Sequence, residues 1–333
     1  MTLGKLFKSN YLYLSFILVF FSCKTDSKVK INGYTMGTSY EVTINNFKDN
    51  PLDVKKFIDE LLVEINDTFS TYIIDSEISK INKSKTNENI KVSERFQKVL
   101  NTALGYCTLS NGSYDVTISP IVELWGFGKN KTQFVPLKSN IEEVLISVGY
   151  ENIYLKDKIL SKNITSLNID LNSIAKGYAV DQVSLFLKHY GYDDFLVEIG
   201  GELKSSSTNL SSWVVGIAHP LSSSVIEKIN LNNYSMATSG TYNNYFIDNE
   251  TMYSHMLNPK TGYPFAYEMI SATVISKDCI DADALATVAF TMNVDSFLDI
   301  INSMDNTDCF LITIDENKNL LFYESEDFSS FIH

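Results

Sequence analysis

The chain is 333 residues long and has 27 Lys plus Arg against 40 Asp plus Glu, a formal net charge of −13. This acidic balance argues against nucleic-acid binding, which needs a basic face, and the 12% of aromatic residues argue against intrinsic disorder. Arg95 is the only arginine, so a phosphate site in this chain has to use Lys, backbone amides or a metal ion.

The N-terminus has the features of a bacterial lipoprotein signal peptide. Lys5 and Lys8 precede an apolar run at residues 11–21, which is short for a membrane span but typical of a secretory signal. Ser22 and Cys23 follow, and a small residue directly before a cysteine indicates cleavage before Cys23 and acylation of its sulfur. The alternative is an uncleaved anchor in which the cysteine is incidental.

These features divide the chain into three parts. Residues 1–22 are predicted to be the signal peptide, residues 23–30 a polar tether and residues 31–333 the folded domain. We expect this domain in the cell envelope, on the periplasmic side, anchored to a membrane through lipidated Cys23. The other cysteines are odd in number and widely spaced, which predicts no disulfide framework, and Cys107 is expected to be a small buried hydrophobe.

Hydrophobic periodicity predicts helices and strands in irregular alternation. The predicted helices begin at Pro51 (capped by Asn50), Ser93, Ser139 (as a cap), Asn172 or Ser173, Asp281 and Val294. The predicted strands cover 31–34, 39–44, 153–155, 159–161, 167–171, 195–199, 213–218, 252–257, 271–275, 310–314 and 320–323. Several strands form hairpins, so the predicted fold class is α+β, a two-lobed unit with mixed or antiparallel sheets and flanking helices.

The first candidate site lies where the predicted strand at 167–171 runs into a helix. The first turn of that helix offers free N–H groups, short polar side chains and Lys176, which together suit an anion and need no arginine. The alternative is ordinary capping by Asn172 or Ser173 with a solvated lysine.

The second candidate is a pair of oxygen ligands, Asp283 and Thr287. They are four residues apart, so on a helix their oxygens share one face. A carboxylate, a hydroxyl and a backbone carbonyl suit a hard cation, Mg²⁺ in particular, which also accepts phosphate oxygens. The alternative is that Asp281 caps the helix and Asp283 lies in its first turn, where the helix dipole favours it.

Weaker features are small-residue turns and one histidine. Glycine turns near residues 37, 112, 200 and 240 permit close approach of a ligand but are also ordinary connectors, and no Gly-x-Gly-x-x-Gly supports a Rossmann site. His255 lies at the end of a predicted strand, before an Asn-Pro-Lys-Thr-Gly turn. A histidine in this position is either a general base or a structural residue.

Taken in order, these motifs resemble the ApbE family of periplasmic FAD:protein FMN transferases. The resemblance covers nearly the whole chain after the tether, and the ordered set of eight motifs is highly specific although each is weak alone. The motifs are Met36-Gly37-Thr38, Phe69-Ser70-Thr71-Tyr72, Tyr114-Asp115-Val116-Thr117 with Leu124-Trp125-Gly126-Phe127-Gly128, Asp170 to Tyr178, Gly200-Gly201-Glu202, Thr238-Ser239-Gly240, Ser254-His255 with Pro259-Lys260-Thr261-Gly262, and Asp281-Ala282-Asp283 with Ala286-Thr287.

The resemblance implies a role for each matching position. The positions implied to line an FAD pocket are Met36, Tyr72, Ser113, Tyr114, Asp115, Asn172, Tyr178 and Leu257, with Lys176 near the diphosphate. The implied Mg²⁺ ligands are the Ala175 carbonyl, the Asp283 carboxylate, the Ala286 backbone and the Thr287 hydroxyl. His255 and Asp283 are the implied catalytic residues, with His255 as the base that activates the acceptor hydroxyl.

The implied activity is Mg²⁺-dependent transfer of FMN from FAD to a Thr or Ser hydroxyl of a partner flavoprotein, with release of AMP. The acceptor is expected to carry an Asp-Gly-x-Thr/Ser-Gly-type segment, which this chain lacks. The alternatives are an FAD pyrophosphatase that uses water on the same site and an FAD-binding lipoprotein without chemistry. The chain departs from the family at Asn258, where Asp is common, and at Asn243-Asn244, where a basic residue is frequent.

Overall fold

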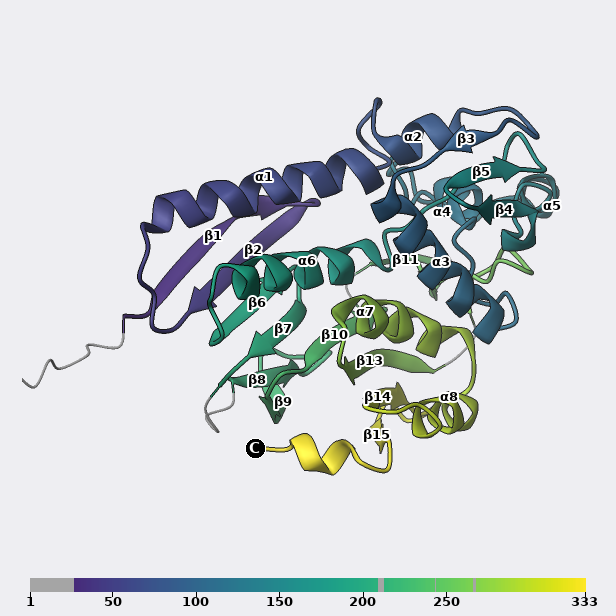
Figure 1. The fold of residues 1–333 in the computed structure, drawn as a ribbon. Helices are drawn as coiled ribbons and strands as arrows, with labels where there is room; N and C mark the ends of the chain where they lie inside the picture. Colours follow the sequence, from purple (N-terminus) through teal and green to yellow (C-terminus); the bar gives the residue numbers. More distant parts are fainter. Residues whose placement is uncertain (1–26, 209–212, 243, 266–267) are drawn as a thin grey trace, which may run out of the picture.

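The computed structural model describes residues 27–208, 213–242, 244–265 and 268–333 (Figure 1). The predicted signal peptide, Cys23 and Asn243 lie outside these residues. Within the described ranges, no helix combines the length and the apolar character needed to cross a membrane.

An eight-stranded sheet forms the centre of the fold, and its neighbouring strands all run antiparallel. In spatial order its strands are β1 (Val29–Thr35), β2 (Thr38–Ile44), β6 (Phe195–Ile199), β7 (Glu202–Ser206), β10 (Ser235–Gly240), β13 (Met269–Ser276), β14 (Asp308–Ile314) and β15 (Leu320–Glu324). This sheet and its helices confirm the predicted α+β class.

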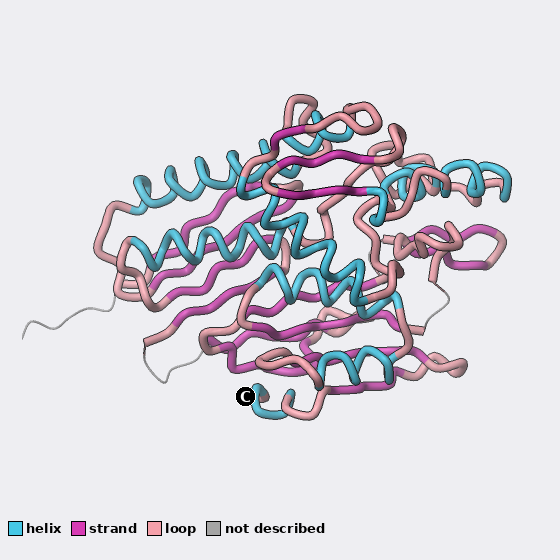
Figure 2. The backbone as a smooth tube through the Cα atoms, turned by 45° about the vertical axis from the view of Figure 1, so that its right-hand side comes forward, coloured by secondary structure: helices cyan, strands magenta, loops and turns pink. Residues whose placement is uncertain are grey.

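Helices cover one face of this sheet (Figure 2). They are α1 (Pro51–Phe69) on β1, α6 (Ala175–His189) on β6 and β7, α7 (Cys279–Val288, continued by η2, Ala289–Thr291) on β10 and β13, and α8 (Val294–Asn302) on β14. The other face packs against the hairpin of β8 (Trp213–Ala218) and β9 (Val225–Leu231) and the short helix η3 (Phe328–Phe331). Because both faces are covered, every residue of β13 is buried.

A smaller lobe adjoins one end of the sheet (Figure 1). Its elements are α2 (Glu77–Asn82), β3 (Ile90–Lys91), α3 (Glu94–Leu109), α4 (Ser119–Leu124), α5 (Lys138–Leu145), η1 (Tyr150–Asn152), β4 (Ile153–Lys156) and β5 (Ile159–Lys162). A separate hairpin, β11 (Tyr245–Asp248) with β12 (Thr251–Ser254), packs on Trp125. One hydrophobic core contains Val197 of the main sheet and Leu160 of β5, so the two lobes share a core.

Two predicted helix starts are confirmed by their caps. The side chain of Asn50 accepts the N–H of Leu52 (3.1 Å) at the start of α1. Ser93 Oγ accepts the N–H of Phe96 (3.1 Å) at the start of α3. In both cases a short polar side chain binds an N–H group that the helix itself leaves free.

The predicted helix starts at Ser139 and Asp281 are wrong. Ser139 is not a cap, because α5 begins one residue before it and no side chain caps that helix. α7 begins at Cys279 rather than Asp281, because Asp181 of α6 accepts the N–H groups of Cys279 and Ile280, both at 3.0 Å. A cap supplied by another helix leaves no trace in the local sequence.

The segment predicted as a strand at 167–171 is buried, but it belongs to no strand of the described structure. Its alternating apolar side chains are fully buried, as the period predicted. A side chain takes the place of a neighbouring strand here: Asn82 accepts the N–H of Ile169 (2.8 Å) and donates to its carbonyl (2.9 Å). The period of apolar residues predicted the burial correctly, but the hydrogen-bond partner of this segment is a side chain and not a strand.

Lys162, the last residue of β5, is fully buried. Its ammonium group donates to three backbone carbonyls, those of Asn82 (2.8 Å), Thr165 (3.0 Å) and Leu167 (2.8 Å). Burial lowers the pKa of Lys162. These bonds hold the segment that leads to Asp170 against the end of α2.

Replacing Lys162 by Met is expected to lower the free energy of unfolding by about 2–4 kcal/mol. The buried carbonyl of Leu167 and the half-buried hydrogen bonds to Asn82 and Thr165 lose their donor, at about 1–3 kcal/mol for each buried group, and relief of the buried charge offsets part of this loss. Urea unfolding followed by circular dichroism measures the change. The control, Lys156→Met at the exposed end of β4, should shift stability by less than about 0.5 kcal/mol. An equal effect of the two variants would refute the role given to the buried ammonium.

Three cysteines of the described chain, Cys107 in α3, Cys279 in α7 and Cys309 in β14, are buried and unpaired. Burial raises the pKa of Cys107 and of Cys309 to about 12, and that of Cys279 well above its ordinary value. Cys107 is therefore the buried hydrophobe that the helical pattern predicted.

Candidate active site

A cavity of about 500 Å³ opens where α6, α7 and the main sheet meet the smaller lobe. Most of the predicted site residues line it, although they come from segments far apart in the sequence. They are Ser113, Tyr114, Asp115, Asn172, Lys176, His255, Leu257, Asp283 and Thr287. The fold thus brings the predicted anion site and the predicted cation site into one cavity.

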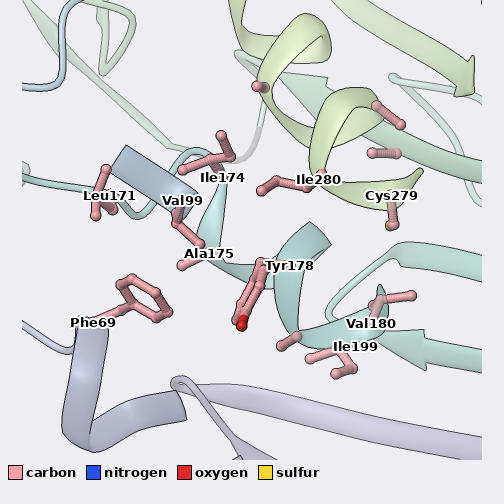
Figure 3. Close-up of a cluster of buried hydrophobic side chains, with 14 of the residues drawn as sticks. Phe69, Val99, Leu171, Ile174, Ala175, Tyr178, Val180, Ile199, Cys279 and Ile280 are labelled. Carbon is pink, nitrogen blue, oxygen red and sulfur yellow. The ribbon is translucent and has the colours of Figure 1, made fainter. Parts of the chain in front are cut away.

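Three predicted FAD contacts do not line this cavity. Tyr72 lines an adjoining cavity of about 330 Å³, and the two cavities share Asp170 in their walls. Met36 lies in the β1–β2 turn, with a φ of 49°. Tyr178 lies in the core (Figure 3), edge-on to Phe69 with 5.6 Å between ring centroids. Contact of these three residues with FAD, for some of them through the backbone only, stays a prediction.

The cavity wall beside α6 is built from short polar side chains. α6 begins at Ala175 rather than at Asn172 or Ser173, and no side chain caps it, so the alternative of ordinary capping by these two residues is wrong. The Asn172 amide donates to the Asp170 carboxylate (3.1 Å), and Ser173 Oγ is hydrogen-bonded to the Tyr114 hydroxyl (2.8 Å). These residues shape the wall, and the first turn of α6 has no local side-chain cap.

The loop at residues 113–115 forms an adjoining part of the cavity wall. Asp115 is buried, and its carboxylate accepts the N–H groups of Thr117 (2.8 Å) and Tyr150 (2.9 Å). Burial raises the pKa of Asp115 and these bonds oppose the rise. The Asp115 carboxylate therefore fixes the loop, and the loop presents Ser113 and Tyr114 to the cavity.

The first turn of α6 is bound by α7. Asp283 Oδ2 accepts the N–H of Gly177 at 2.8 Å, and the Asp283 carboxylate is buried. Gly177 allows this approach, because a Cβ there would lie 2.3 Å from the carbonyl oxygen of Cys279 and 2.7 Å from Asp283 Cβ. The carboxylate predicted to hold a cation thus lies directly beside the predicted anion site.

Lys176 lies between two buried carboxylates. Its ammonium group donates to Glu202 Oε1 and lies 4.0 Å from Asp283 Oδ1. Burial, and secondly the neighbouring Asp283, raise the pKa of Glu202 to about 8. Because the two buried carboxylates share one ammonium, Glu202 holds its proton more strongly than a free carboxylic acid does.

Thr287 follows Asp283 by one turn of α7, and its Oγ1 lies 3.4 Å from Ser239 Oγ of β10. The alanines implied as backbone ligands, Ala175 and Ala286, are both buried. Among the described residues, no three His, Cys, Asp or Glu side chains gather in an arrangement that could hold a metal. A cation here would rely on a mixed set of carboxylate, hydroxyl and carbonyl oxygens, which suits a hard cation such as Mg²⁺.

His255 faces the cavity just beyond the end of β12, so the predicted strand at 252–257 is shorter than expected. Its Nδ1 lies 3.0 Å from the carbonyl oxygen of Asn244. A carbonyl only accepts, so Nδ1 carries the proton and Nε2 is left with its lone pair. Burial lowers the pKa of His255, which keeps the ring neutral at pH 7.

The geometry agrees with comparisons to known proteins. The model of the ApbE family matches residues 36–311, which is most of the chain. The chain belongs to the ApbE family. It is 34% identical over 330 residues to an FAD:protein FMN transferase from Vibrio cholerae, covering 96% of this chain and 97% of that protein. It is 35% identical to one from Haemophilus influenzae, covering 89% and 90%.

Solved structures of ApbE proteins share the fold. The flavin transferase ApbE from Vibrio cholerae superposes with a TM-score of 0.84 at 32% identity, covering 92% of this chain and 99% of that chain. The ApbE protein from Thermotoga maritima superposes with a TM-score of 0.83 at 30% identity, covering 92% and 100%.

Four residues at the site received no role from the sequence. Glu202 lines the cavity and binds Lys176, and Asp170 lies in the walls of both cavities. Asp181 fixes the start of α7, and Ser239 lies beside Thr287. Asp170, Glu202 and Ser239 could have been suspected, because each belongs to one of the family motifs in the sequence, whereas Asp181 belongs to none.

Proposed function

We propose that this chain is an FAD:protein FMN transferase, the activity named for its relatives from Vibrio cholerae and Haemophilus influenzae. The observation that supports it most is the single cavity that joins Lys176 at the start of α6 to Asp283 and Thr287 on α7. The acceptor would be a Thr or Ser hydroxyl in an Asp-Gly-x-Thr/Ser-Gly-type segment of a partner flavoprotein.

We propose that Mg²⁺ is the metal of this site, and the charges support it. Asp283 and Glu202 are both buried, only one ammonium lies between them, and Glu202 Oε2 has no hydrogen-bond partner among the described residues. The Ala175 carbonyl, the Asp283 carboxylate, the Ala286 backbone and the Thr287 hydroxyl would hold the ion. When bound, it would neutralise charge on the diphosphate and on the departing AMP.

Other residues of the chain would bind the diphosphate and accept the proton. Lys176 and the first turn of α6 would hold the diphosphate, and the loop at 113–115 would form the adjoining wall. The acceptor oxygen forms a bond to the phosphorus of the FMN half, and the bond from that phosphorus to the AMP oxygen breaks. His255 Nε2 takes the proton of the acceptor hydroxyl, and AMP leaves.

This role predicts a defined pH dependence. The base form of His255 is the neutral ring, and burial lowers its pKa from the ordinary 6.5. Transfer should therefore hold as the pH falls to about 6.5 and decline only below it, as Nε2 becomes protonated. His255→Gln should slow transfer about 10²- to 10⁴-fold and remove this acidic limb. A limb that persists in the variant would assign the titration to another group.

The activity itself is tested with FAD, Mg²⁺ and an acceptor that carries the expected segment. Covalent flavin on the acceptor together with free AMP supports transfer. FMN and AMP without flavinylation would instead indicate a pyrophosphatase, and unchanged FAD would indicate an FAD-binding lipoprotein. An acceptor with Ala in place of its Thr or Ser is the control and should remain unlabelled.

We also propose that Cys23 carries a lipid that holds the protein on the periplasmic side of a membrane. The basic residues, the apolar run and the Ser22-Cys23 pair support this. Cys23→Ser is expected to move the protein from the membrane fraction to the soluble fraction, and mass spectrometry should find a diacylglyceryl group only on the natural chain. Retention of the variant in the membrane would point to an uncleaved anchor.

A further inference from the structure

Glu202 at the start of β7 is a buried carboxylate with half of its bonding capacity unused. It is 3% exposed, and it follows the tight turn at Gly200 and Gly201. Oε1 accepts from Lys176, whereas Oε2 is one of only two buried side-chain polar atoms of the described residues without a partner. Native proteins seldom leave such an atom unpaired. We therefore expect a bound group that is not part of the chain to contact Oε2.

The surroundings restrict what that group is. Glu202 lines the same cavity as Asp283 and Thr287, and Asp283 contributes to the raised pKa of Glu202. A diphosphate offers oxygen acceptors and no donors, so a bare carboxylate facing it would repel it. A divalent cation beside the two carboxylates would remove that repulsion, favour the ionised form of Glu202 and add two positive charges that complement a diphosphate.

We propose that Glu202 supplies a second carboxylate to the cation site, in addition to the ligands implied by the family. Its Oε1 restrains Lys176, and its Oε2 would hold the metal together with Asp283. This inference rests on the proposed Mg²⁺-dependent function and adds a ligand to it. It also explains why the Gly200-Gly201 turn leads directly into a buried acid, a residue type that is rarely buried without a partner.

The test is binding of Mn²⁺, a probe for Mg²⁺, to the protein without FAD, measured by calorimetry and by the electron paramagnetic resonance of free Mn²⁺. Glu202→Gln is nearly isosteric and should weaken binding about 10- to 100-fold. The matched control is Glu198→Gln, because Glu198 contacts the same turn through Gly201 N–H (2.8 Å) and lies outside the cavity lining. It should bind Mn²⁺ like the natural chain, and circular dichroism verifies that both variants fold.

A double substitution separates direct binding from an effect through Lys176. If Glu202 only keeps the ammonium away from Asp283, Lys176→Met combined with Glu202→Gln should recover the affinity of Lys176→Met alone. If Glu202 binds the metal, the double variant should stay about 10- to 100-fold weaker than Lys176→Met. Recovery would overturn the proposal.

The remaining outcomes are also distinct. Failure of the natural chain to bind Mn²⁺ would refute the proposed metal dependence together with this inference. Normal Mn²⁺ binding by Glu202→Gln would refute this inference alone. If that variant bound Mn²⁺ normally but lost metal-free FAD binding, Glu202 would instead contact a sugar hydroxyl of FAD, and the proposal would likewise fall.

Discussion

Replacing Asp283 by Asn is expected to abolish metal binding and to slow flavin transfer by about three orders of magnitude. The side chain keeps its size, but the buried site loses a charge that Lys176, 4.0 Å away, already competes for. Loss of charge stabilisation at a transferring phosphoryl group typically costs about 10²- to 10³-fold. Single-turnover transfer to the acceptor and Mn²⁺ calorimetry measure the two effects.

Asp281 provides the control on the same helix. Its carboxylate accepts a hydrogen bond from the Tyr106 hydroxyl (2.7 Å) and does not line the cavity. Asp281→Asn should keep transfer within about threefold of the natural rate. The side-chain oxygen of the introduced asparagine can still accept the Tyr106 hydrogen bond, and a change of charge outside the cavity has a small effect on the reaction. Wild-type transfer by Asp283→Asn at low Mg²⁺ would remove Asp283 from the mechanism.

Gly177→Ala is expected to be damaging although it adds a single methyl group in a helix. The new Cβ would lie 2.3 Å from the Cys279 carbonyl oxygen, so α6 and α7 would have to separate. Such overpacking costs about 1–3 kcal/mol of unfolding free energy. Because the Asp283 carboxylate binds the Gly177 N–H, we expect Mn²⁺ affinity to fall as well.

Gly105→Ala in α3 is the matched control, because a Cβ there meets no atom within 4 Å. Alanine is the better helix former, so this variant should be stabilised by about 0.5–1 kcal/mol. Urea unfolding of both variants and Mn²⁺ titration of Gly177→Ala provide the measurements. If Gly177→Ala were as benign as Gly105→Ala, the close α6–α7 contact would not exist in solution.

The sequence predicted those parts of the site that lie within one segment. Asp283 and Thr287 share a helix face because they are four residues apart, and Lys176 follows from its place near a helix start. Their meeting in one cavity was implied only by the family resemblance. No periodicity indicates that α6 and α7 touch, since that contact depends on the packing of two helices on one sheet.

Contacts between side chains of different elements could not be predicted from the sequence for the same reason. Glu202 meets Lys176 because β7 lies beneath α6, and Asp181 caps α7 from another helix. The strand predicted at 167–171 failed likewise, because Asn82 replaces the strand partner. In each case a side chain that is distant in the sequence makes the hydrogen bond that rules based on local sequence assign to a nearby residue or strand.

The three buried thiols of the described residues can be used to measure local opening of the structure. Cys107 lies in the smaller lobe, Cys279 begins the helix that carries Asp283, and Cys309 lies in the main sheet. A thiol reacts with an alkylating agent only when its surroundings open, so the labelling rate at each position measures the free energy of that local opening. Substrate that tightens the site should slow alkylation of Cys279 more than that of Cys309, so the change is measured without introducing a cysteine.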